Sequence, residues 1–138
     1  MGYDWRGLME MPKLDSVSEA QAHLVVSARL WVALRKRGSD PATMMEQRFG
    51  SEAASWNFWL LMEEVGTAWP DPFMVSPPCC RRMSHDEKVL LDMIQYGADG
   101  DRGAFLRLLQ EMLPVEIADR LYASTRTFLV SLTAPASP

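Results

Sequence analysis

The apolar residues of this chain recur at three-and-four spacing in most segments, and this pattern constrains the fold more than any other feature. It is broadest between about residues 16 and 37, where apolar side chains cover nearly the whole circumference of the expected helix: Leu24, Val25, Val26, Ala28, Leu30, Trp31, Val32, Ala33 and Leu34. A helix that is apolar on most sides usually lies at the centre of a bundle. No segment keeps the apolar–polar alternation that a half-buried strand needs. The sequence therefore predicts an all-α fold.

Helix start and stop signals divide the pattern into five or six helices. Each expected helix begins at a residue whose side chain can accept a hydrogen bond from a free N–H group, or at a proline. The expected starts are Ser16 or Ser18, Asp40 with Pro41, Ser51, Ser84 with Glu87 as a capping box, and Pro114, with a further helix around Phe105 after a turn at residues 98–103. We expect the first and last helices to form much of the core, because both have broad apolar faces.

The length of 138 residues is that of one domain. We therefore expect a single all-α domain, 1–138, a compact bundle of five to six helices. The helical pattern is interrupted by a proline-rich loop at residues 69–83. We also expect a flexible arm at residues 1–15 and a frayed tail at residues 133–138.

The charge balance argues against general nucleic-acid binding. The formal net charge is -4, whereas binding to a phosphate backbone relies on basic surface. A helix-turn-helix in the last three helices is disfavoured for the same reason, since none of them is a basic recognition helix. No apolar run approaches the roughly 20 residues that span a bilayer, and the first residues carry acids and Pro12 where a signal peptide needs an apolar core. We expect a cytoplasmic protein with no membrane partner.

The stretch VSPPCCRRMSHDEK, residues 75–88, is the one segment whose residues suggest chemistry beyond packing. Its ligand or redox candidates are Cys79, Cys80, Arg81, Arg82 and His85. Adjacent cysteines converge poorly on one ion, because structural zinc favours cysteines two to four residues apart, so we expect no metal. A thiolate is favoured near cations and a helix N-terminus, which makes a redox-sensing thiol reasonable. The two arginines could instead hold a small anionic ligand, although Asp86 and Glu87 compete for the same positive field.

No motif of the sequence identifies an enzyme. We find no glycine-rich phosphate loop, no nucleophile elbow and no paired-histidine helix motif. Cys80 and His85 could form a nucleophile and its base, but no family signature flanks them. We therefore expect no catalytic residue and no cofactor.

Methionine and tryptophan are frequent, with ten and five residues respectively. Met adapts to irregular contacts and Trp often anchors interfaces, although a helical core can also use both. The candidates for an interaction surface around the end that bears the loop are Met44, Met45, Trp56, Trp59, Trp69 and Phe73.

The segment from Pro78 to Leu91, PCCRRMSHDEKVLL, resembles an uncharacterised family of small alphaproteobacterial helical proteins. Members of that family carry Pro-Cys-Cys, then Arg-Met, a Ser or Thr cap, Asp-Glu and an apolar helix. The resemblance implies a helical bacterial protein of unknown role, in which Cys79, Cys80, Arg82 and Met83 are the first residues to examine.

Our leading hypothesis is a non-enzymatic interaction or regulatory protein that acts through a Met- and Trp-containing apolar surface as a homodimer. The alternative is a thiol-based redox sensor, or a binder of a small anionic ligand, at Cys79, Cys80, Arg81 and Arg82.

Overall fold

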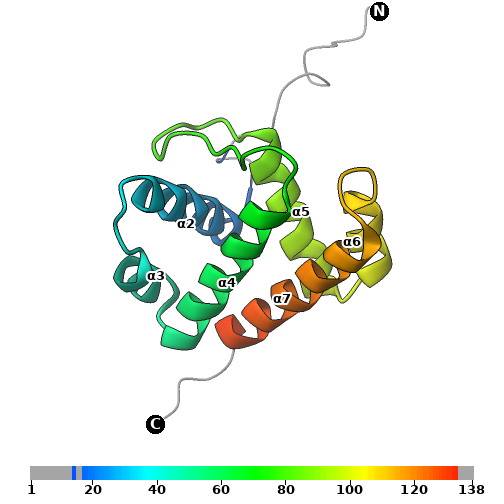
Figure 1. Ribbon diagram of the computed structural model, residues 1–138. Coiled ribbons are helices and arrows are strands. Elements are labelled where there is room, and N and C mark those ends of the chain that lie inside the picture. The colour runs from blue at the N-terminus through cyan, green and yellow to red at the C-terminus, as the bar shows by residue number, and fades with distance from the viewer. Residues whose placement is uncertain (1–13, 15–16, 134–138) are drawn as a thin grey trace, which may run out of the picture.

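The computed structural model describes residue 14 and residues 17–133, and this part of the chain is a bundle of helices without a strand (Figure 1). The helices are α2 (Glu19–Lys36), α3 (Ala42–Phe49), α4 (Glu52–Ala68), α5 (His85–Asp99), α6 (Arg102–Leu109) and α7 (Val115–Thr133). The predicted all-α bundle is confirmed. Most of the expected arm and most of the expected tail lie outside the described residues, but Leu14 of the arm is described and packs against the core.

The predicted serine caps start α2 and α4 as expected, whereas at α3 the N-cap is Pro41, one residue after the expected Asp40, and no side chain at that position caps the helix. Ser18 Oγ accepts the Gln21 N–H at 3.2 Å while Gln21 Oε1 accepts the Ser18 N–H at 3.0 Å, which is a complete capping box at the start of α2. Asp40 Oδ1 accepts the Ala42 N–H at 2.9 Å at the start of α3. Ser51 Oγ accepts the Ala54 N–H at 3.1 Å at the start of α4. Local hydrogen bonds that are visible in the sequence therefore set these helix boundaries.

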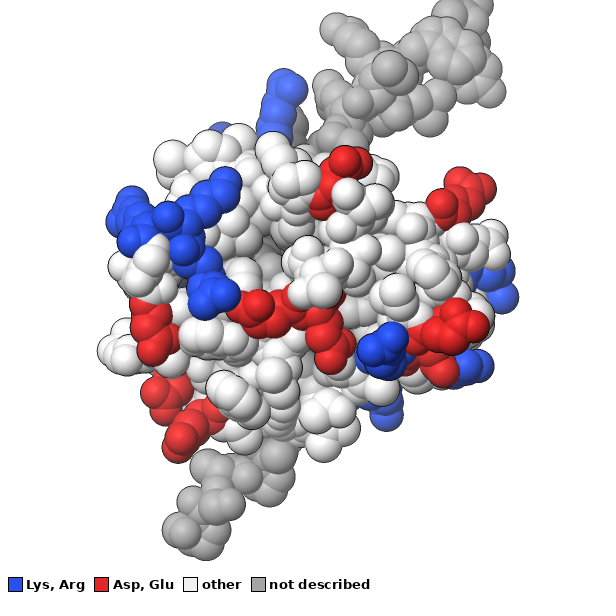
Figure 2. All heavy atoms as spheres, in the orientation of Figure 1, with Lys and Arg blue, Asp and Glu red and all other residues white. Residues whose placement is uncertain are grey.

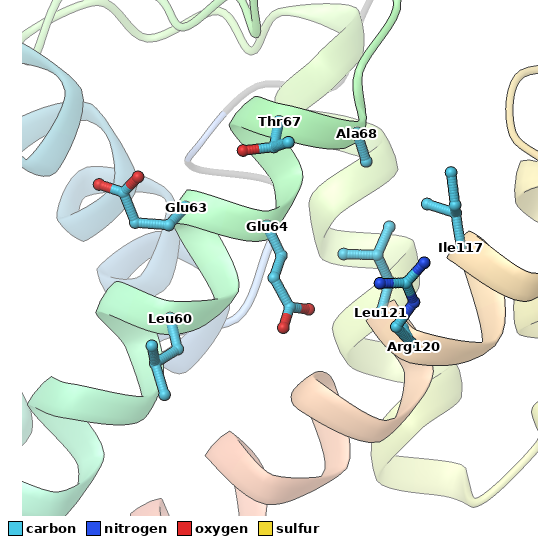
Figure 3. Close-up of a pocket in the computed structure, with 8 residues that line it drawn as sticks. All are labelled: Leu60, Glu63, Glu64, Thr67, Ala68, Ile117, Arg120 and Leu121. Atoms are coloured by element: carbon cyan, nitrogen blue, oxygen red, sulfur yellow. The ribbon is translucent and has the colours of Figure 1, made fainter.

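The centre of the bundle is the pair α4 and α7, which pack along each other more extensively than any other helices described. Ser124 Oγ donates to Glu64 Oε2 at 2.6 Å, and Ala68 lies at the same end of the pair as Ile117, so the two helices run antiparallel (Figure 3). The first and last of these helices both contribute buried apolar side chains to the core, among them Val25 and Ala28 of α2 and Leu121 and Phe128 of α7. They do not form the central pair, because α2 packs mainly on α3 and α5.

Three phenylalanines join α3 to this central pair. The ring of Phe49 lies 4.9 Å from that of Phe58 and 5.4 Å from that of Phe128, and the last two rings are 5.4 Å apart. Phe58 and Phe128 are fully buried. Such tilted and edge-on contacts are the favoured geometries of aromatic pairs, so this cluster stabilises the packing of α3 against α4 and α7.

None of the helices in the described part of the chain has the length and apolarity to cross a membrane.

The helices α5 and α7 approach each other closely at Gly97. A Cβ atom at this position would lie 2.7 Å from Thr125 Cγ2 and 3.3 Å from Leu129 Cδ1. Thr125 cannot turn away freely, because it is fully buried and its Oγ1 donates to the Leu121 carbonyl at 2.8 Å. The absence of a side chain at Gly97 is therefore what allows this crossing.

We predict that Gly97→Ala lowers the free energy of unfolding by about 1–3 kcal/mol, because the added methyl group overpacks the crossing. The matched control is Gly66→Ala in α4, where an added Cβ meets nothing within 4 Å. There the better helix propensity of alanine should raise stability by up to about 1 kcal/mol. Urea unfolding of both variants checks the sign of each change, and equal effects of the two substitutions would contradict the close crossing.

Candidate functional site

A buried ion pair between Arg29 and Glu87 lies beneath the loop that carries the two cysteines. Arg29 comes from the middle of α2 and is 1% exposed, and Glu87 comes from the first turn of α5 and is 0% exposed. Arg29 Nε donates to Glu87 Oε2 at 2.7 Å and Arg29 Nη2 to Glu87 Oε1 at 3.1 Å. This is the bidentate geometry in which an arginine and a carboxylate interact most strongly.

The remaining hydrogen bonds of this ion pair go to the backbone of the loop. Arg29 Nη1 donates to the Cys80 carbonyl at 2.6 Å, and Nη2 donates to the Arg82 carbonyl at 3.0 Å. Glu87 accepts the N–H of Ser84 at 2.8 Å and that of Ser76 at 3.2 Å. The pair thus binds four backbone groups between residues 76 and 84. We call Arg29 and Glu87 the clamp.

Asp86 holds the first part of the same loop. Its two carboxylate oxygens accept the Trp69 Nε1–H at 3.1 Å and the Met74 N–H at 2.8 Å. Ser84 Oγ, which caps α5, also donates to the Met74 carbonyl at 2.6 Å. The segment SHDE therefore starts a helix and at the same time organises the loop that precedes it.

The cysteines lie on the outside of this loop as free thiols. Cys79 is exposed and Cys80 is half-buried, and the Cys80 N–H donates to the Pro77 carbonyl at 2.9 Å across a turn. Arg82 and His85 are exposed. Arg81 is also exposed, and its carbonyl accepts the Leu14 N–H at 2.8 Å. Among the described residues no group of three or more histidine, cysteine or acidic side chains is arranged to hold a metal ion.

The arrangement at the start of α5 does not favour the predicted anion site. The Glu87 N–H is already capped by Ser84 Oγ at 3.0 Å, and the carboxylates of Asp86 and Glu87 occupy the same end of the helix. A bound anion would have to compete with these two negative charges. The buried arginine is Arg29, whereas Arg82 contributes its backbone carbonyl to the clamp.

Sequence reasoning missed Arg29 altogether. The signal was present, because Arg29 is the only Lys, Arg, Asp or Glu residue between Glu19 and Arg35, in a largely apolar stretch, and a buried charged residue needs a partner. The partner itself, Glu87, was interpreted only as a helix cap. Nothing local indicates that this cap would also pair with a residue 58 positions earlier in the chain.

The predicted interaction surface is only partly at the surface. Met45 is 0% exposed and Trp69 is 7% exposed, so both belong to the core and their assignment to the surface is wrong. Met44 and Phe73 are half-buried against the core. Trp56, by contrast, is 60% exposed, and Trp59 is half-buried beside it. The helix α4 therefore carries what remains of the predicted surface.

An ordered aromatic cluster supports the exposed ring of Trp56. Trp56 stacks on Trp59 with ring centroids 6.5 Å apart, and Trp59 meets Trp31 of α2 edge-on at 6.4 Å. The guanidinium of Arg35 lies over both the Trp59 ring, at 5.2 Å, and the Trp31 ring, at 5.4 Å. Arg35 also pairs with Glu63 at 2.6 Å. We call the outward residues of this part of α4, Trp56, Trp59 and Leu60, the tryptophan face.

A groove of about 330 Å³ between α4 and α7 continues from the tryptophan face (Figure 3). Leu60, which is 40% exposed, is shared by the face and the groove. Glu64 and Arg120 extend from opposite helices, while Glu63 points away from α7 towards α2. The residues that line the groove are Leu60, Glu63, Glu64, Thr67, Ala68, Ile117, Arg120 and Leu121.

Charges of both signs lie around this part of the molecule. Figure 2 shows Lys and Arg side chains gathered over the C-terminal end of α2, where Arg35, Lys36 and Arg37 are exposed. Asp and Glu side chains lie across the middle of the same face. Arg35 of the basic area lies over the Trp59 ring, and Glu63 and Glu64 line the groove beside Leu60, so charges of both signs adjoin the tryptophan face.

Comparison of the chain with models of known families, with curated proteins and with solved structures finds no match. Membership in the alphaproteobacterial family that the Pro-Cys-Cys segment resembles therefore stays a prediction.

We predict that Arg29→Met lowers the free energy of unfolding by about 3–5 kcal/mol, because it leaves Glu87 as a buried, uncompensated charge. The matched control is Arg102→Met. Arg102 pairs with Asp119 at 2.8 Å, but both side chains are about half exposed, so solvent screens their interaction. The urea midpoint of this control should equal that of the unmodified protein. A clamp variant as stable as the control would show that the buried pair does not hold the loop.

Proposed function

We propose that this protein is a non-enzymatic interaction module that forms a homodimer through the tryptophan face of α4. The observation that carries the proposal is that Trp56 is 60% exposed although its ring is held in place by stacking on Trp59. Exposure of a large aromatic side chain to water is unfavourable. Burying it in an interface removes a large apolar area from water, which favours association.

The order of the aromatic cluster favours binding. A side chain that is already fixed loses little conformational entropy when a partner covers it. Trp59 stacks on the ring of Trp56, and Trp59 is in turn packed against Trp31 and Arg35. Rigid tryptophans with this kind of support are enriched among the residues that dominate interface energies.

A second copy of the chain is the partner that fits the surrounding charges. A two-fold axis places the same patch of both subunits in contact, so the patch must complement itself. The tryptophan face is apolar, and charges of both signs adjoin it: Arg35 lies over the Trp59 ring, and Glu63 and Glu64 line the groove that shares Leu60. An axis through the face can therefore bring the basic side chains of one copy against the acidic side chains of the other.

The compartment we propose is the cytoplasm. Cys79 and Cys80 are unpaired thiols, and one of them is exposed. Thiols persist in this state where glutathione and thioredoxin keep proteins reduced.

We predict that Trp56→Glu and Leu60→Glu each weaken dimer formation at least about 30-fold, because each places a charge at the desolvated centre of the interface. The control is Val115→Glu, which replaces another exposed apolar side chain, 57% accessible, in the first turn of α7. A carboxylate is well tolerated at that position of a helix. Sedimentation equilibrium over a dilution series measures all three variants.

An unmodified protein that stays monomeric at about millimolar concentration would contradict the proposal, since an interface weaker than this contributes only about 4 kcal/mol. A dimer that Val115→Glu disrupts and Trp56→Glu leaves intact would place the interface elsewhere.

A further inference from the structure

The two cysteines belong to the loop segment whose backbone the clamp binds, and the proposed dimer does not use them. Cys79 and Cys80 are adjacent and free, and Cys79 is exposed to reagents in solution. The backbone carbonyl of Cys80 is the acceptor closest to Arg29, at 2.6 Å from Nη1. A change in the backbone conformation of Cys80 therefore alters a hydrogen bond of the buried Arg29 guanidinium.

We infer that Cys79 and Cys80 form a redox-modification site, in which a peroxide joins the two sulfurs as a reversible disulfide and thereby releases the loop from Arg29. This inference is independent of the proposed dimer. It gives the double-cysteine segment a role that follows from its contacts rather than from its composition.

The chemistry needs only the two thiols and one molecule of hydrogen peroxide. One thiolate attacks the peroxide O–O bond, which gives a sulfenic acid and, after protonation of the leaving hydroxide, one water. The neighbouring thiol then attacks the sulfenic sulfur, forms the S–S bond and expels a second water. Two electrons pass from the sulfurs to the peroxide. A dithiol reductant reverses the step by thiol–disulfide exchange.

A disulfide between adjacent residues cannot form without moving the backbone. Neighbouring Cα atoms are about 3.8 Å apart across a trans peptide bond, whereas Cα atoms joined by a disulfide are usually about 4.4–6.8 Å apart. Because rotation about the backbone bonds cannot lengthen this distance, the ring is strained, and it relieves that strain by changing the torsion angles at both residues and at the peptide bond between them. Strained and exposed disulfides are also the readily reduced ones, which suits a reversible modification.

The backbone of Cys80 is held on both sides, so new torsion angles break existing hydrogen bonds. Its N–H donates to the Pro77 carbonyl at 2.9 Å, and its carbonyl accepts from Arg29. Loss of the second contact leaves a buried guanidinium N–H without an acceptor, which is unfavourable. Arg29 Nη2 also donates to the Arg82 carbonyl, at 3.0 Å. Because Arg82 follows Cys80 by two residues in the same loop, a shift of the Cys80 backbone weakens this hydrogen bond as well.

The test treats the reduced full-length protein with an equimolar amount of hydrogen peroxide. We expect the intact mass of each chain to fall by about 2 Da, which is the loss of two hydrogens in disulfide formation, and both thiols to become unreactive towards iodoacetamide. The midpoint of thermal unfolding should fall by about 5 °C because of the lost clamp contact. Cleavage by protease between residues 69 and 84 should become about tenfold faster. Dithiothreitol should restore all four values.

Two variants separate the ring from other oxidation products. Cys79→Ser and Cys80→Ser each keep one thiol and cannot close the ring, so peroxide should change neither their unfolding midpoint nor their cleavage rate in the loop. The inference is overturned if peroxide gives a sulfinic acid or a disulfide between two chains instead of the 2 Da loss. It is equally overturned if the ring closes while the unfolding midpoint and the cleavage rate stay unchanged.

Discussion

The structure depends on one buried ion pair, Arg29 with Glu87. Moving two charges out of water is costly, and the cost is offset only when the remaining hydrogen-bonding positions are also filled. Here the neighbouring acceptors and donors are backbone groups of the loop between α4 and α5: the carbonyls of Cys80 and Arg82 and the N–H groups of Ser76 and Ser84. The ion pair and the loop therefore need each other. Without the loop the outer hydrogen-bonding positions of the pair are unfilled, and without the pair four backbone groups of the loop lose their buried partners.

The clamp is also connected to the proposed interaction surface. The helix α4, which carries the tryptophan face, ends at Trp69, and the indole of this residue donates to Asp86 at 3.1 Å. Asp86 precedes Glu87 in the first turn of α5, so one helical turn binds both the end of α4 and the side chain of Arg29 from α2. The segment that looked like a chemical site in the sequence thus serves first to join three helices. The two cysteines lie in the part of the loop where a change in the backbone acts on this junction.

The sequence predicted what depends on local signals, and it could not predict what depends on contacts between distant segments. Apolar spacing and caps such as Ser18 and Ser51 located the helices because both features act within a few residues. Periodicity indicates that a face is apolar but not which neighbour covers it. For this reason Met45 and Trp69 were assigned to a surface and are in the core, while Trp56, another of the same candidates, is exposed. The pairing of Arg29 with Glu87 follows only from the packing of α2 on α5.

Hydrogen exchange at the backbone amides of Ser76 and Ser84 tests the central claim most directly. Both N–H groups belong to the loop, and both donate to the buried carboxylate of Glu87. If the clamp holds the loop, these amides exchange only when the bundle opens, with protection close to that of Leu90 in the core of α5. Exchange within about tenfold of the rate of an unstructured peptide would mean that the loop is not held, and it would contradict the account.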